Sequence, residues 1–314
     1  MTFARKISKI FACLSVIGLT PVYAAEGGSG FYLLGTRSQM AGMSLNPGLY
    51  VQNDMYFYSG KSRTNLDVPI AGGAYVGVDA KAYVLLPTII FVPNTKVADG
   101  RLTLNATLPL GYKNVSAFAD IPAVGVGAET SSRTTRLGDP TVGASLGWNS
   151  GRWNWNIAGL INIPAGDYRR DQLANISYNH WGMDVTGAIT WFDPATGWDI
   201  SGAVGLTFNA KNSVTNYRSG TESHFEAAIS KRLPSGLSVG VAGYYYDQLT
   251  GDRGGGAILG DYKGRAAALG TVASYDFMLK KQPISLKFKF FSELSTRNRV
   301  EGNAAFISIS LPLL

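Results

Sequence analysis

Apolar and polar side chains alternate one by one along most of this chain, which is the repeat of a β-strand. The clearest case covers residues 198–209, where Trp198 and Ile200 fall in one frame and Asp199 falls in the other. Residues 183–191 alternate in the same way, and the connection between the two runs is made of Asp, Pro, Ala, Thr and Gly. Residues of these types form tight turns. The pattern therefore predicts a hairpin with one apolar face and one small, polar face.

Twelve segments of this kind follow one another, with boundaries good to about three residues. They cover residues 47–58, 76–92, 101–113, 137–149, 152–163, 180–192, 197–210, 221–232, 237–247, 264–277, 284–295 and 301–313. Helical periodicity is almost absent, so the sequence predicts an all-β fold.

The connections between these segments alternate between short and long. The short turns are residues 93–100, 150–151, 193–196, 233–236 and 278–283. The connections on the other side are longer, up to 23 residues at 114–136, apart from the last one at 296–300. This is the layout of an outer-membrane barrel, and a β-protein can cross lipid only as a closed barrel because lipid offers the backbone no hydrogen bonds. We therefore expect a transmembrane, antiparallel up-and-down β-barrel of about 12 strands, with 10 or 14 as the alternatives.

The tryptophans fall at the ends of the predicted strands, where a membrane barrel places its aromatic girdles. Five of them lie beside two short turns and one at the opposite end of its strand: Trp148, Trp153, Trp155, Trp191, Trp198 and Trp181. A soluble sandwich or propeller is the alternative, but its core tryptophans would lie near strand middles.

Composition agrees with a barrel that has one face in lipid. Of the 314 residues 46% are hydrophobic and only 16% are charged, against about 25% charged in ordinary domains. The mean hydropathy is +0.05, and no apolar run reaches the ~18 residues of a membrane helix. These values exclude a bundle of membrane helices.

The first 24 residues predict a secretory signal peptide. Arg5, Lys6 and Lys9 precede an apolar region of ten residues, 10–19, and Val22 and Ala24 provide small residues for cleavage near Ala24. A lipoprotein signal that uses Cys13 is the alternative, but this cysteine lies too close to the charged region. Cleavage removes three of the 28 basic residues, none of the 21 acidic ones and the only cysteine. The mature charge of 25 minus 21, or +4, is too small and scattered to predict a nucleic-acid partner.

Residues 25–46 precede the first predicted strand, so the chain divides into 1–24, 25–46 and a barrel over 47–314. The middle segment is Gly-rich with an apolar centre at residues 31–34. We expect it to fold into the lumen as a partial plug, the alternative being a disordered segment in the periplasm.

The frame opposite to the apolar one would face the lumen and holds the candidate solute path. Ring faces and hydroxyls of tyrosine suit a small phenol-like solute, although inward tyrosines can also simply fill space. The candidates are Tyr56, Tyr58, Tyr244, Tyr246, Glu222, His224 and Glu226.

The alternation of Glu222, His224 and Glu226 along one strand resembles a proton-sensitive or metal-binding cluster. We favour the alternative of a charged lumen wall paired with Lys287 and Lys289, and predict neither a metal nor a cofactor. A hydrolase would need a base beside a nucleophile. His180 at a loop edge and His224 among carboxylates do not provide that pair.

Several runs, read together and in order, resemble a known family. They are residues 30–35, 47–50, 164–168, 173–176, 179–181, 196–198, 212–220 and 243–252, which read GFYLLG, PGLY, PAGDY, LANI, NHW, TGW, NSVTNYRSG and GYYYDQLTGD. They are similar to the outer-membrane transporter family of the meta-pathway of phenol degradation, the phenol MetA-pathway family. The resemblance implies a porin-like channel in a Gram-negative outer membrane for passive uptake of small hydrophobic or aromatic compounds. It assigns no catalytic residue, and its expected partners are outer-membrane lipids and the solute. The alternatives are a structural or adhesive barrel without transport and, least favoured, an outer-membrane hydrolase.

Overall fold

The computed structural model of the chain describes residues 30–66, 74–121, 126–170, 172–255, 257 and 263–313. The predicted signal peptide and its cleavage site therefore lie outside the described residues, as do residues 25–29. Every regular element within the described ranges is a β-strand. None of these residues forms a helix that is long and apolar enough to span a membrane.

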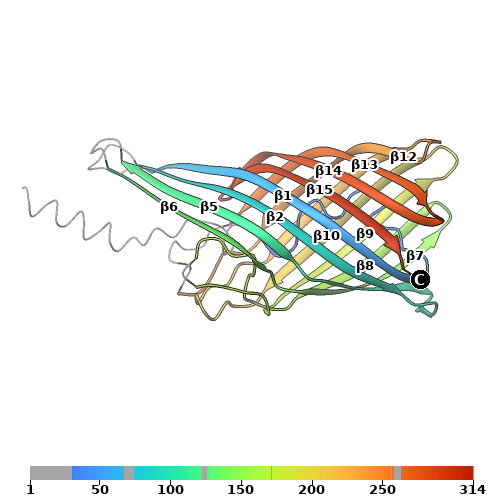
Figure 1. The fold of residues 1–314 in the computed structure, drawn as a ribbon, viewed down its shortest axis with the longest axis horizontal. Helices are drawn as coiled ribbons and strands as arrows, with labels where there is room; N and C mark the ends of the chain where they lie inside the picture. The colour runs from blue at the N-terminus through green and yellow to red at the C-terminus, as the bar shows by residue number, and fades with distance from the viewer. Residues whose placement is uncertain are drawn as a thin grey trace, which may run out of the picture.

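The strands belong to a single antiparallel sheet, in which every strand from β7 to β15 pairs with the next one along the chain (Figure 1). They are β1 (Gly48–Leu66), β2 (Ala74–Val92), β3 (Lys96–Val97), β4 (Gly100–Thr107), β5 (Leu110–Ile121), β6 (Val126–Leu137), β7 (Thr141–Ser150), β8 (Trp153–Asn162), β9 (Gly182–Asp193), β10 (Trp198–Asn209), β11 (Glu222–Arg232), β12 (Leu237–Gln248), β13 (Arg265–Leu279), β14 (Gln282–Arg297) and β15 (Glu301–Pro312).

The sheet closes on itself. β1 pairs with β15 on one side and β2 on the other, and β2 completes the circle by pairing with β4. Two wall strands are each interrupted once, between β4 and β5 and between β6 and β7. Pro109 and Pro140 lie in these interruptions, where a residue without an N–H cannot join the ladder. With each interrupted pair counted as one strand and the short β3 left out, the barrel has twelve strands, as predicted.

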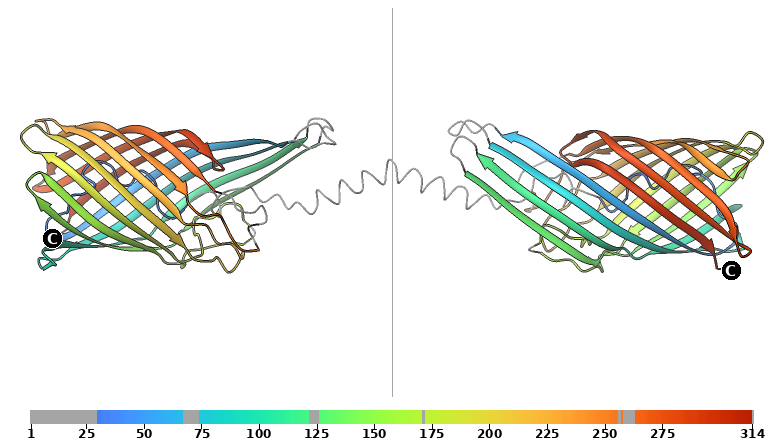
Figure 2. Two further views of the ribbon diagram at one scale, coloured as in Figure 1. Left: turned by 180° about the vertical axis from the view of Figure 1, so that it is seen from behind. Right: turned by 45° about the horizontal axis from the view of Figure 1, so that its top comes forward.

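The wall includes strands that the sequence pattern did not predict. The expectation of a long loop over residues 114–136 is wrong, because β5 and β6 pair along their whole length there. With β1 and β2 they extend past the other strands at one end of the barrel, opposite the end marked C (Figures 1 and 2). Val78, Val115 and Ala117 of this extension pack on Ala174 of the loop between β8 and β9. Small and polar residues dominate residues 126–136, so no alternation of apolar and polar positions marks the strand.

Burial follows the predicted frames, with the apolar frame outside. On β10 Ile200 and Val204 are 50% and 60% exposed, whereas Asp199 and Thr207 are buried within the barrel. A water-soluble barrel would reverse this arrangement, so the outer face is built for lipid.

The tryptophans lie at strand ends. Trp153 and Trp198 are 50% and 41% exposed on the outer face at the end of the barrel that carries the short turns, which we call the turn end. The ammonium of Lys231 lies 5.0 Å from the ring centroid of Trp198. Their role as an interface girdle stays a prediction.

Residues 30–46, here called the N-terminal segment, run inside the barrel (Figure 2). The segment starts near the opposite end, the loop end, where the Tyr178 hydroxyl donates to Gly30 O at 2.9 Å. It finishes near the turn end, where Arg101 donates to Leu45 O at 3.1 Å. Gly42 lies so close to the wall that a Cβ there would meet Asn154 O at 2.5 Å.

Candidate functional site

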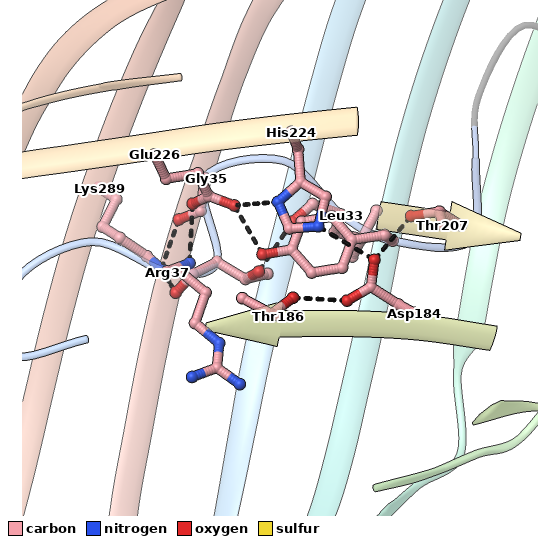
Figure 3. Close-up of polar contacts among 11 residues, drawn as sticks. Leu33, Gly35, Arg37, Asp184, Thr186, Thr207, His224, Glu226 and Lys289 are labelled. Atoms are coloured by element: carbon pink, nitrogen blue, oxygen red, sulfur yellow. Dashed lines mark hydrogen bonds and ion pairs between the residues drawn. The ribbon is translucent and has the colours of Figure 1, made fainter. Parts of the chain in front are cut away.

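Two oppositely charged wall residues hold the N-terminal segment (Figure 3). Glu226 of β11 accepts hydrogen bonds from the Tyr32 hydroxyl at 2.7 Å and from the Arg37 backbone N–H at 2.8 Å. Lys289 of β14 donates to the carbonyls of Gly35 and Thr36 at 2.8 and 3.1 Å. Hydrogen bonds that involve a charged group are among the stronger ones in proteins, so this turn of the segment is held firmly.

His224 connects the segment to a neighbouring strand. Its Nε2 lies 3.0 Å from Asp184 Oδ2, and its ring is stacked on Tyr32 with centroids 3.7 Å apart. The hydroxyls of Thr186 and Thr207 donate to the same Asp184 carboxylate at 2.6 and 2.7 Å. The imidazole is therefore fixed in orientation by a carboxylate on one side and by the segment on its face.

The expected pairing of the lumen acids with Lys287 and Lys289 is not what the structure shows. Among the described residues no ion pair within 4.0 Å joins Glu222 or Glu226 to Lys287 or Lys289. Instead, Glu226 and Lys289 both bind the N-terminal segment. Within the described residues no group of three His, Cys, Asp or Glu side chains is placed to hold a metal ion.

A pocket lies in the lumen on the loop side of the segment. Its empty volume is about 500 Å³, the solvent space at its mouth included. The segment contributes Gly30, Tyr32, Leu33 and Leu34, and the wall contributes Tyr56, Tyr58, Thr207, Glu222, His224, Tyr244, Tyr246, Glu293 and Arg299. The structure thus brings six of the seven solute-path candidates to one pocket. The seventh, Glu226, does not line the pocket and binds the segment instead.

Glu293 orients two of the pocket tyrosines. Its carboxylate accepts hydrogen bonds from the hydroxyls of Tyr58 at 2.9 Å and Tyr244 at 3.1 Å, and from the Gly302 N–H at 2.8 Å. These bonds fix both hydroxyls on a wall carboxylate, so the orientation of the two tyrosine side chains that line the pocket is set by Glu293.

Arg299 is a pocket residue that the sequence did not reveal. It lies in the short connection between β14 and β15, and its guanidinium carbon is 4.3 Å from the ring centroid of Tyr246. An arginine in a short connection is ordinarily solvated, and only closure of the barrel brings this one to the tyrosines.

A second buried carboxylate, Asp139, holds the loop between β8 and β9 over the interruption between β6 and β7. It accepts hydrogen bonds from five donors at 2.7 to 3.2 Å: the Asn162 amide, the Gly166 N–H, the Ser177 hydroxyl and the N–H groups of Tyr178 and Asn179. Because Tyr178 also contacts Gly30, the loop, the wall and the N-terminal segment are linked.

His180 lies at the end of the same loop, at the edge where the sequence placed it. Burial lowers the pKa of its imidazole, and its Nδ1 lies 3.1 Å from Trp181 O. It lies apart from the pocket, which it does not line.

Solved structures similar to this chain are outer-membrane barrels. The COG4313 outer membrane channel from Pseudomonas putida F1 has 15% sequence identity and a TM-score of 0.61, with 87% of this chain and 98% of that chain covered. The transport unit of the autotransporter AIDA-I from Escherichia coli has 10% identity and a TM-score of 0.46, covering 91% and 94%. A Pseudomonas aeruginosa FadL homologue has 9% identity and a TM-score of 0.40, covering 85% and 90%. The first of these likenesses shows a shared fold, that of an outer-membrane channel barrel.

No curated protein matches the sequence. One family model does match, over residues 65–309, and its description is "Putative MetA-pathway of phenol degradation". The match covers most of the chain and agrees with the resemblance seen in the sequence motifs. The chain therefore belongs to this family.

Proposed function

We propose that the chain is an outer-membrane channel for the passive uptake of small hydrophobic or aromatic compounds. The observation that carries the proposal is the pocket on the loop side of the N-terminal segment, which is lined by four tyrosines of the wall and by Tyr32 of the segment. Small-molecule sites are typically concave and lined by aromatic side chains, with a few fixed polar groups. Tyrosine rings offer flat apolar contact area to another ring.

The N-terminal segment forms the floor of the pocket and holds the channel closed. Tyr32, Leu33 and Leu34 contribute to that floor, and bonds to Glu226 and Lys289 keep the segment in place. A solute can pass along the lumen only when part of the segment moves. Hydrogen bonds to charged groups contribute about 1.5–3 kcal/mol each, so release of the part of the segment that Glu226 and Lys289 hold requires breaking only a few of them.

The outer surface is consistent with a place in the outer membrane after secretion. Large apolar residues such as Val241 and Phe225, 60% and 51% exposed, cover the wall. The mature chain then presents apolar side chains to lipid and polar side chains to its own segment, as membrane barrels do.

Uptake by intact Gram-negative cells tests the proposal. Phospholipid vesicles are unsuitable because small aromatics cross them unaided, whereas the lipopolysaccharide leaflet of an outer membrane slows them. We expect cells that produce the chain to take up labelled toluene and phenol several-fold faster than cells without it, with no change for a labelled disaccharide. Equal rates with and without the chain would favour a structural or adhesive barrel, and breakdown of outer-membrane phospholipid would favour a hydrolase.

A further inference from the structure

The pocket contains a buried hydrogen-bond donor that nothing in the described part of the chain accepts. Arg299 Nε is enclosed by protein and has no partner. The guanidinium lies over the Tyr246 ring and makes no ion pair within 4.0 Å among the described residues. A buried donor without a partner is costly to a folded protein, so it marks a place where a ligand atom can bind.

The acids nearby do not satisfy this donor. Glu293 is occupied by two tyrosine hydroxyls and one backbone N–H. Glu222 accepts a hydrogen bond from the Asn209 amide at 3.1 Å. Both acids line the same pocket as Arg299, and the Glu293 carboxylate, which accepts hydrogen bonds from three donors, contributes negative charge to it.

This combination restricts the class of solute. The Nε–H group requires an oxygen or nitrogen acceptor, while the Glu293 carboxylate opposes an anionic solute in the confined space. The tyrosine rings favour a flat aromatic body. A neutral ring with one oxygen substituent satisfies all three conditions.

We propose that Arg299 is a specificity-determining residue, whose Nε–H donates to the oxygen of neutral, oxygen-bearing aromatic solutes and selects them over aromatic hydrocarbons and aromatic carboxylates. The inference rests on the proposed function and deepens it by naming the solute class. A site built to hydrogen-bond a substituent rejects the analogue without it, because the buried group is then left unpaired.

Isothermal titration of the purified full chain in detergent tests the inference with phenol, toluene and benzoate. Phenol and toluene have the same ring, but phenol carries a hydroxyl group where toluene carries a methyl group. We expect the parent chain to bind phenol about tenfold more tightly than toluene, the ratio that one hydrogen bond to a charged group supplies. Benzoate should bind more weakly than phenol.

Two matched variants complete the experiment. Arg299→Met keeps an unbranched side chain and removes the donor, so phenol affinity should fall about tenfold to the level of toluene while toluene affinity stays unchanged. Arg297→Met removes an exposed arginine two residues away that does not line the pocket, and should behave as the parent.

A comparison of anisole with ethylbenzene in the parent chain needs no variant and keeps the test open if Arg299→Met fails to fold. Anisole has an oxygen acceptor but no hydroxyl hydrogen, and it should bind more tightly than ethylbenzene. Equal affinities for phenol and toluene, equal affinities for anisole and ethylbenzene, or tighter binding of benzoate would each overturn the inference. In those cases the rings still bind, so the proposed function survives, whereas an absence of binding by every aromatic probe would overturn both.

Discussion

The ring of Tyr32 lies on the imidazole of His224, with centroids 3.7 Å apart and planes inclined by 18°. Tyr32 belongs to the N-terminal segment and His224 to β11, two parts of the chain that only the closed barrel brings together. The hydroxyl of the same tyrosine donates a hydrogen bond to the carboxylate of Glu226, the next inward residue of β11. One side chain thus connects the segment to two successive inward positions of the wall.

Replacing Tyr32 with alanine should loosen the segment. The variant loses the ring stack and the hydrogen bond to Glu226, together about 2 kcal/mol. This corresponds to about a thirtyfold shift toward the released segment. In planar bilayers we expect more frequent or larger open-channel events than in the parent. Leu45→Ala, at the exposed end of the segment, is the control, and equal conductance of Tyr32→Ala and parent would show that the segment does not close the lumen.

Replacing Asp139 with asparagine should free the loop between β8 and β9. The amide keeps the shape of the side chain but offers one acceptor atom to the five donors that the carboxylate satisfies. We expect a loss of about 3 kcal/mol in the local stability of the loop. Hydrogen exchange should show the amides of Gly166, Tyr178 and Asn179 losing protection. Asp276→Asn, at a partly exposed ion pair with Arg232, should leave this protection intact.

The loop should also weaken as the pH falls, because burial lowers the pKa of His180 in the folded protein. Above the ordinary pKa of about 6.5 the imidazole is neutral in both states and costs nothing. Below it the unfolded loop binds a proton that the folded loop does not, so stability falls by at most about 1.4 kcal/mol per pH unit until the folded pKa is reached. The hydrogen-exchange protection factors of the loop amides at pH 7.5 and 5.5 measure this effect. In His180→Gln the part of the pH-dependent loss of protection that comes from this imidazole should disappear. Stronger protection at the lower pH would contradict the sign.

The tryptophans should report the depth of the membrane interface. Trp153 and Trp198 are exposed on the outer face at the turn end, where aromatic girdles meet the headgroups. In bilayers that contain brominated lipids, bromine near the headgroup should quench tryptophan fluorescence more strongly than bromine near the chain ends. If bromine at the bilayer centre quenched the tryptophan fluorescence most strongly, the tryptophans would not form a girdle at the interface.

Local patterns predicted much of this barrel. On β10 the alternation of Asp199 and Ile200 gave the correct faces, because a strand presents successive side chains to opposite sides. The same alternation placed Tyr244 and Tyr246 in the lumen and Tyr245 outside.

Other features escaped the sequence because they depend on contacts between distant segments. β6 and the part of β5 after residue 113 were missed. In β6, residues such as Ser131, Ser132 and Thr134 do not alternate in hydrophobicity. Arg299 and Tyr32 carry no local signal, since their partners Tyr246 and His224 come from strands far away in the chain.

The most direct measurement compares uptake of labelled phenol by cells that produce the parent, a pocket variant or an outward-facing control. Tyr244 and Tyr246 line the pocket, whereas Tyr245 between them is 41% exposed on the outer face. Heat-modified gel mobility and surface labelling establish that each variant forms the barrel in equal amount. We expect parent and Tyr245→Ala cells to show the same saturable uptake, and cells with Tyr244→Ala and Tyr246→Ala combined to lose most of it. Unchanged, saturable uptake by the pocket variant would contradict a solute path through this pocket.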